Sequence, residues 1–194
     1  MNKLKLKIAL NAKAVLIFVL LCFIATVLGI VTNSNATKLL FATYRSSWLS
    51  PLTYVRLFSH VLGHSGWEHF LGNASMLLIL GPMLEEKHGS KVIVEIILIT
   101  GFITGIVNFI FFPGVALCGA SGVVFAFILL ASFTGFREGE IPLTFILVAI
   151  IYIGQQIVQG LTLNDNISNL GHIIGGLVGA VVGYALNKKG RRSY

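Results

Sequence analysis

The sequence predicts an all-α, polytopic membrane protein with six transmembrane helices, and three observations lead to this fold class. Hydrophobic residues make up 56% of the 194 residues and charged residues only 11%, whereas an ordinary soluble domain has about 25% charged residues. The mean hydropathy is +0.89, and the apolar residues gather in six segments. Finally, the basic residues are divided unequally between the segments that would lie on the two sides of a membrane.

The six apolar segments define the predicted spans. A helix needs about 20 apolar residues to cross a bilayer, and the second and fourth segments are short for this. Each is therefore expected to extend into polar neighbours at its start, as far as Trp67 and Ala120. The predicted spans are residues 9–31, 67–84, 92–112, 120–136, 141–159 and 170–186. They use most of the chain, so residues 1–194 are predicted to form a single membrane domain.

The distribution of Lys and Arg predicts the orientation. Three of the fourteen lie in the first loop, namely Lys38, Arg45 and Arg56. The other eleven lie in the terminal segments and after the second and fourth spans: Lys3, Lys5, Lys7, Lys13, Lys87, Lys91, Arg137, Lys188, Lys189, Arg191 and Arg192. The positive-inside rule therefore places both termini in the cytoplasm, as an even number of spans requires. Orientation then accounts for the net charge of +7, and we expect no nucleic-acid partner. The charged turn from Leu84 to Ser90 is interpreted as orienting and capping helices.

The first segment also has features of a signal peptide, with a lysine-rich start and small residues at Ser34-Asn35-Ala36 that could form a cleavage site. Its apolar run from Ala14 to Val31 is longer than the usual signal-peptide core, so we predict that it is retained as the first span. Cys22 and Cys118 are the only cysteines. Both lie in apolar or membrane-level surroundings, so they imply no disulfide framework.

The longest polar connection, residues 33–69, falls on the outer face in this topology. It is too apolar for a solvated loop of its length, so we expect short helical pieces that pack into the outer leaflet or against the helices. The apolar side chains behind this expectation are Trp48, Leu49, Leu52, Tyr54, Val55, Leu57 and Phe58.

Histidines follow this loop into the second span. His69 and Asn73 are four residues apart, so they share one helix face. We interpret His60 and His64 as structural groups that bond the loop backbone. Three histidines within ten residues could bind zinc, but no H-E-x-x-H pattern is present, and Ser65 stands where the H-x-x-E-H variant needs a histidine. A metal site remains the weaker hypothesis, and we predict no metal and no cofactor.

A serine and a histidine begin two helices that are expected to pack together. Glycines recur at every fourth residue from Gly171 to Gly183 in the last span, and small residues surround Ser121 in the fourth. Such residues let membrane helices approach closely, and packing alone could explain Ser121. An intramembrane histidine, however, points to function, so His172 beside Ser121 suits activation of a nucleophile. The Ser121 N–H, His69 and Asn73 could then stabilise an oxyanion.

These residues resemble the rhomboid family of intramembrane serine proteases. Gly119-Ala120-Ser121-Gly122 is similar to the nucleophile motif of the family, His69 and Asn73 to its second-helix pair, and His172 with Gly175 to its last-helix base and packing glycine. The similarity runs from about Arg56 to Gly183, through Arg56, His60, His64, Gly81, Glu85, Gly89 and Ser90. The chain departs from the family at Val55, often tryptophan, and at Phe125, often tyrosine; Phe125 can still stack on His172.

The resemblance implies a rhomboid-like helical bundle in its minimal six-helix bacterial form, in a cell membrane that we expect to be a bacterial plasma membrane. It implies a serine endopeptidase in which Ser121 is the nucleophile and His172 the base. The Ser121 N–H, His69 and Asn73 would stabilise the oxyanion. Its partners would be transmembrane protein substrates and the lipid bilayer, with the fifth span and the loops at 112–117 and 160–169 as lateral gate and lid. The sequence carries no signal for an oligomeric state.

Two other classes of function remain open at this point. A non-catalytic rhomboid-like protein would bind membrane helices without cutting them, but such a protein would be expected to lack Ser121 or His172. A small transporter or channel would use the polar interior as a pathway instead. Labelling by a serine-directed reagent at Ser121 would distinguish a protease from both.

Overall fold

The computed structural model describes residues 10–132, 141, 143–162 and 166–190. Within these residues the chain is all-helical, as predicted, apart from an isolated β-bridge between Thr43 and Leu117. In chain order the helices are α1 (Lys13–Val31), α2 (Asn35–Leu40), α3 (Pro51–Ser59), the 3-10 helix η1 (His60–Leu62), α4 (Trp67–His88), α5 (Ser90–Phe111), α6 (Ser121–Ser132), α7 (Leu143–Thr162) and α8 (Asn166–Gly190).

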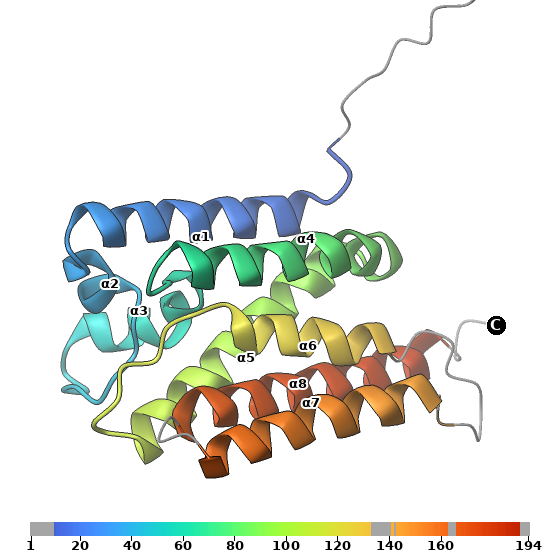
Figure 1. The fold of residues 1–194 in the computed structure, drawn as a ribbon. Coiled ribbons are helices and arrows are strands. Elements are labelled where there is room, and N and C mark those ends of the chain that lie inside the picture. Colours follow the sequence, from blue (N-terminus) through green and yellow to red (C-terminus); the bar gives the residue numbers. More distant parts are fainter. Residues whose placement is uncertain (1–9, 133–140, 142, 163–165, 191–194) are drawn as a thin grey trace, which may run out of the picture.

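Helix α6 lies at the centre of the bundle. Figure 1 shows α1 and α4 on one side of it and α7 and α8 on the other, while α5 crosses behind. The packing is closest between α6 and α8, as the glycine pattern predicted. Because neighbours surround α6, most of its side chains are buried: Val123, Val124, Ala126, Phe127, Ile128, Leu129 and Leu130. Ser121, the first residue of α6, is therefore held inside the bundle at one end.

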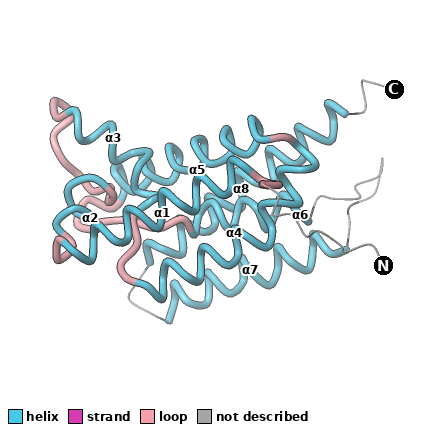
Figure 2. Tube along the Cα trace, turned by 90° about the horizontal axis from the view of Figure 1, so that it is seen from above, coloured by secondary structure: helices cyan, strands magenta, loops and turns pink. Residues whose placement is uncertain are grey.

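The segment between α1 and α4 contains the short helical pieces expected from its composition. Figure 2 shows α2, α3 and the long loops around them gathered at one end of the bundle. Side chains tie this segment down through backbone carbonyls: Arg56 Nε donates to Leu39 O at 2.8 Å, and Asn108 Nδ2 on α5 donates to Thr43 O and Val115 O, both at 3.1 Å. The loop is thus a fixed part of the fold, because each bond satisfies a backbone group that water would otherwise serve.

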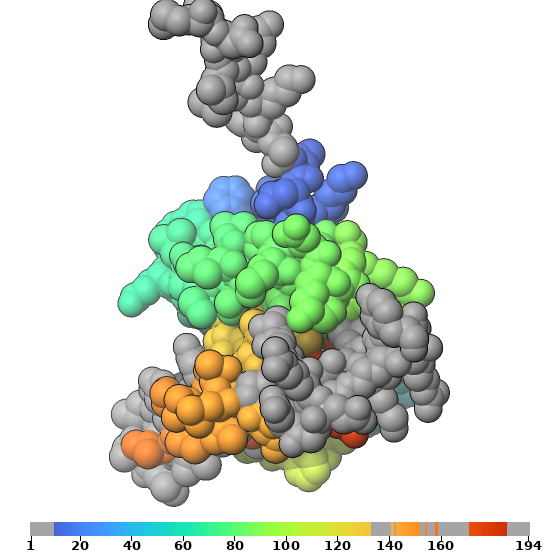
Figure 3. All heavy atoms as spheres, turned by 90° about the vertical axis from the view of Figure 1, so that its right-hand side faces the viewer, coloured from blue at the N-terminus to red at the C-terminus, as the bar shows by residue number. Residues whose placement is uncertain are grey.

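Glu85 on α4 links α1 and the start of α5 at the opposite end of the bundle. Its carboxylate accepts hydrogen bonds from Ala14 N at 2.9 Å, Val15 N at 3.0 Å and Ser90 Oγ at 2.7 Å. A carboxylate at a helix N-terminus satisfies unpaired N–H groups and opposes the positive end of the helix dipole. The predicted capping role of this turn is confirmed, and the helix that is capped is α1. Figure 3 views this end of the molecule, where the first residues of α1 lie on α4 and α5.

Two of the described helices, α1 and α5, have both the length and the hydropathy of a membrane span, while α6 and Gly171–Ala185 are shorter apolar helices. Six spans with cytoplasmic termini therefore stay a prediction. The connection expected over residues 160–169 is shorter than predicted, because α7 continues to Thr162 and α8 begins at Asn166. Some basic residues used to predict the orientation lie outside the described residues: Lys3, Lys5, Lys7, Arg137, Arg191 and Arg192.

Candidate active site

Ser121 begins α6 directly after a loop that only glycine can form. Gly119 has φ +133°, in the region that L-residues avoid, and its N–H donates to His60 O at 2.9 Å. The first intrahelical bond of α6 runs from Val124 N to Ala120 O at 3.0 Å. Ser121 therefore lies in the first turn, where backbone N–H groups have no acceptor within the helix. The residue is half-buried.

His69 lies against the same loop. A Cβ atom at Gly119 would be 2.8 Å from His69 Cε1, 2.9 Å from His69 Nε2 and 3.8 Å from Ser121 Oγ. Both the imidazole and the hydroxyl therefore border the space that the missing Gly119 side chain leaves open, and a side chain there would fill it. The structure brings His69 and Ser121, from α4 and α6, to one place.

Asn73 lies one turn after His69 on α4, as the spacing of four residues predicted. It is buried, with 9% of its surface exposed, and its Nδ2 atom has no hydrogen-bond partner among the described residues. A buried amide without a partner costs about 1–3 kcal/mol. Such a donor is suited to an acceptor that arrives with a ligand or forms during a reaction.

His172 on α8 is held by an aromatic neighbour on α6. Its ring stacks on Phe125 with a centroid distance of 4.4 Å and an interplanar angle of 4°, so the predicted stacking is confirmed. Phe125 is one turn after Ser121, and the two residues therefore share a face of α6. The stack holds the imidazole over the helix face that begins with Ser121.

Glycines bring the two helices into backbone contact beside His172. A Cβ atom at Gly175 would lie 2.1 Å from Gly122 O, and one at Gly179 would lie 2.1 Å from Ala126 O. A Cβ atom at Gly122 would in turn lie 3.5 Å from Gly171 O. Since Ser121 and Gly122 are adjacent, and His172 lies between Gly171 and Gly175, this contact holds the two predicted dyad residues close to the α6–α8 interface.

His60 and His64 both bond backbone carbonyls: His64 bonds the loop backbone, as predicted, whereas His60 bonds helix α5 instead. His60 is 1% exposed, and its Nε2 lies 3.0 Å from Gly101 O, while His64 Nδ1 lies 3.1 Å from Leu62 O. Burial lowers the pKa of each to about 4, and nearby His69 also lowers that of His64. Both rings are therefore neutral at pH 7. The His64 ring packs edge-on against that of His69, with centroids 4.9 Å apart.

The sequence did not predict the contact between Ser65 and His69, and Ser65 entered only as a reason to exclude a zinc motif. Ser65 Oγ lies 3.2 Å from His69 Nδ1. When the hydroxyl donates to Nδ1, the neutral ring carries its proton on Nε2, the nitrogen that lies beside the Gly119 backbone. The spacing of four residues to His69 is the only sequence signal for this contact. Within the described part of the chain, no three His, Cys, Asp or Glu side chains are placed to hold a metal ion.

Comparisons with known proteins agree with this architecture. Residues 51–189 match the family model of the rhomboid domain. The chain is 31% identical over 159 residues to rhomboid-related protein 2 of Mus musculus, a match that covers 71% of this chain and 52% of that protein. It is 29% identical over 142 residues to rhomboid protease GlpG of Haemophilus influenzae, covering 71% of this chain and 72% of that protein. The chain thus spans about half the length of the mouse relative. It belongs to the rhomboid family, whose members are embedded in membranes.

Proposed function

We propose that this protein is an intramembrane serine endopeptidase that uses Ser121 and His172 as a catalytic dyad. The observation that carries the proposal is the α6–α8 interface, where Phe125 stacks on His172 one turn from Ser121 and Gly175 lies against the Gly122 backbone. The match to a relative named a rhomboid protease supports the same activity. A histidine held beside a serine is the arrangement that activates a hydroxyl nucleophile.

In the proposed reaction, Ser121 Oγ attacks the scissile carbonyl carbon while His172 accepts the hydroxyl proton. The C–N bond then breaks as His172 donates that proton to the leaving amine. Water attacks the resulting acyl-enzyme, with His172 again acting as the base, and releases Ser121.

The oxyanion formed in these steps needs donors. The Ser121 N–H at the start of α6, His69 Nε2 and Asn73 Nδ2 are proposed to supply them. The buried Asn73 Nδ2, which has no hydrogen-bond partner among the residues that the structure describes, and the position of His69 beside Gly119 support this assignment. Ser65 is proposed as a positioning residue, because its hydroxyl can hold His69 in the tautomer that donates from Nε2.

The proposed substrates are transmembrane proteins that are cut within or near their membrane helix. A hydrogen-bonded helix hides its carbonyl groups, so residues that unwind the helix locally are expected at the cleavage point. We propose that the protein is a multi-pass cell-membrane protein with six spans and cytoplasmic termini. In that topology Ser121 lies near the outer face, and α7 with the loops beside it forms the lateral gate.

Activity-based labelling tests the proposal directly. A serine-directed fluorophosphonate is expected to label the purified protein once, and Ser121→Ala is expected to abolish both this labelling and cleavage of a model transmembrane substrate. His172→Ala is expected to abolish cleavage while the protein stays folded. Undiminished cleavage by purified Ser121→Ala would refute the protease assignment. If the unmodified protein were neither labelled nor able to cleave the substrate, a protein that only binds membrane helices would be favoured.

A further inference from the structure

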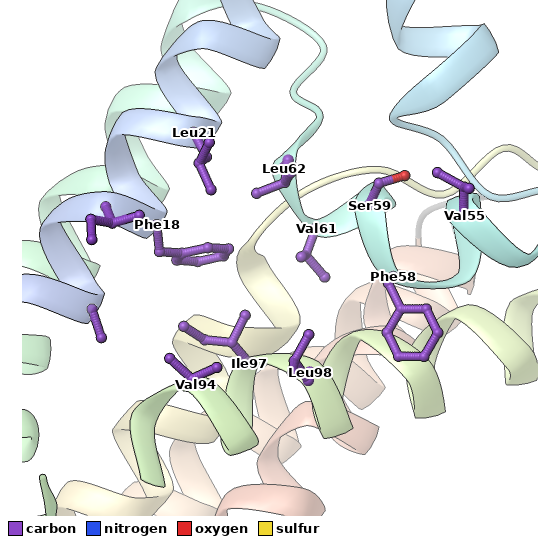
Figure 4. Close-up of a pocket in the computed structure, with 12 residues that line it drawn as sticks. Phe18, Leu21, Val55, Phe58, Ser59, Val61, Leu62, Val94, Ile97 and Leu98 are labelled. Atoms are coloured by element: carbon purple, nitrogen blue, oxygen red, sulfur yellow. The ribbon is translucent and has the colours of Figure 1, made fainter. Parts of the chain in front are cut away.

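An apolar groove with a volume of about 520 Å³ lies between α1, the α3–η1 segment and α5. Figure 4 shows Phe18 and Leu21 from α1 facing Val94 and Ile97 from α5 across this space. The only polar side chain in the lining is Ser59, whose hydroxyl donates to Leu40 O. Water in the groove would therefore find almost no hydrogen-bond partners. In a membrane-embedded protein, hydrocarbon is the filling that this lining favours.

Two lysines stand at one end of the same groove. Lys13 is the first residue of α1, and it precedes the lining residue Ile17 by four positions on one helix face. Lys91 is the second residue of α5, and it precedes the lining residues Val94 and Leu98 by three and seven positions on one face. Both lysines are exposed. Because α1 and α5 begin at the same end of the bundle (Figure 1), both lysines lie at one end of the groove, which we call its mouth.

Two acidic side chains near this mouth differ in how firmly they are held. The Glu85 carboxylate faces the N-terminus of α1, where Ala14 N and Val15 N donate to it. Glu95 lies 3.9 Å from Lys91, but the two side chains are 52% and 89% exposed. An exposed pair of this kind contributes little and is easily exchanged for another partner. An anion that displaces Glu95 from Lys91 would therefore meet two cations at the mouth.

We propose that this groove binds one anionic phospholipid, with an acyl chain between α1 and α5 and the phosphate between Lys13 and Lys91. The volume falls within the range of about 300–1,000 Å³ that is typical of small-molecule sites. Basic groups next to apolar pockets between membrane helices are suited to anionic head groups. The site lies apart from Ser121 and does not depend on the proposed proteolysis.

Native mass spectrometry of the full chain, with defined phospholipids, tests this site. Dioleoyl phosphatidylglycerol is expected to be retained more strongly than dioleoyl phosphatidylcholine. Each lysine is expected to raise the ratio of the two retentions about fivefold. In the double variant Lys13→Gln/Lys91→Gln this ratio is expected to fall about 25-fold, while the groove still binds the acyl chains of both lipids. Lys87→Gln, at an exposed lysine near the end of α4, is the matched control, because α4 contributes no residue to the lining. It is expected to keep the preference for the anionic lipid.

A second pair of variants tests the groove itself. Leu98→Trp is expected to fill the space and to abolish retention of both lipids, whereas Ile79→Trp, on the exposed face of α4, is expected to leave retention unchanged. Val94→Phe provides the same test with a smaller change if Leu98→Trp does not fold, and circular dichroism checks the fold of each variant. If the groove-filling variants retained the lipids as well as Ile79→Trp does, the groove would not be the binding site. Equal retention of the two lipids, or a preference that survives the double lysine substitution, would overturn the anionic assignment.

Discussion

Replacing Gly175 by alanine puts a methyl group into the contact between α8 and α6. The new Cβ atom would lie 2.1 Å from Gly122 O, 2.7 Å from Gly122 C and 2.8 Å from Gly122 Cα, whereas ordinary contacts begin at 3.4 Å. All three atoms belong to the backbone, so no side chain can rotate away. The two helices must therefore separate by about 1 Å, because a close-packed interior has no free space to absorb the methyl group.

This separation is expected to lower both stability and activity. Overpacking of this kind costs about 1–3 kcal/mol, which corresponds to a fall in melting temperature of about 2–12 °C for a chain of this size. His172 lies one turn before Gly175, so the same displacement moves its ring relative to Ser121. A misplacement of about 1 Å at a reacting group lowers the rate about 100-fold.

The assay compares Gly175→Ala with Gly176→Ala by thermal unfolding in detergent and by initial rates on a model transmembrane substrate. A Cβ atom at Gly176 meets Leu129 Cδ1 at 3.2 Å, the mobile tip of a side chain, so this variant is expected to be close to the unmodified protein in both measurements. Gly179→Ala has the same backbone clash as Gly175→Ala but lies one turn further from His172, so its rate is expected to fall less. If Gly175→Ala matched Gly176→Ala in both measurements, the argument from the α6–α8 contact would be refuted.

Three further changes separate other contributions. Ser65→Ala is expected to lower kcat about tenfold at unchanged KM, less than the roughly 100-fold loss expected for His69→Ala, because it removes only the bond that holds the ring; an unchanged kcat would remove Ser65 from that role. The free energy of unfolding is expected to fall as the pH is lowered from 6.5 to about 4, because His60 is protonated at its ordinary pKa in the unfolded chain, whereas its pKa in the folded protein is lowered to about 4. His60→Gln is expected to reduce the slope of unfolding free energy against pH by about 1.4 kcal/mol per pH unit over this range. An unaltered slope would contradict the burial of a neutral His60. Glu85→Gln is expected to lower stability by about 1–2 kcal/mol through its hydrogen bonds to α1, and thermal unfolding should show no such loss for exposed Glu86→Gln.

The features that the sequence predicted depend on local spacing. Glycines at every fourth residue of the last span face one direction in any helix, so the close approach of α8 to α6 follows from the pattern. The stacking of Phe125 on His172 follows from that packing, because Phe125 lies one turn from Ser121. The short helices between α1 and α4 were likewise expected from composition alone.

The features that the sequence did not predict depend on contacts between distant segments. Glu85 and Ala14 are 71 residues apart, and nothing in either segment indicates that one caps the other. The space that Gly119 leaves for His69 depends on a φ of +133°. The chain has 21 glycines, and the sequence does not indicate which of them adopts such a conformation. The groove between α1 and α5 also depends on three segments meeting. The roles of Ser121, His172, His69 and Asn73 stay predictions until the variants are measured.

The start of α6 explains why the nucleophile is proposed at Ser121 and not deeper in the helix. Helices α4, α6 and α8 all begin at the same end of the bundle (Figure 1), and His69, Ser121 and His172 lie in the first two turns of these helices. Each helix start carries unpaired N–H groups and a partial positive charge. A serine one turn further into α6 would have its N–H bonded to the preceding turn, so it could not donate to the oxyanion that forms on the substrate oxygen when the serine hydroxyl attacks. In the proposed mechanism, backbone and neutral side-chain donors therefore stabilise the oxyanion beside Ser121, and no lysine or arginine is needed for this role.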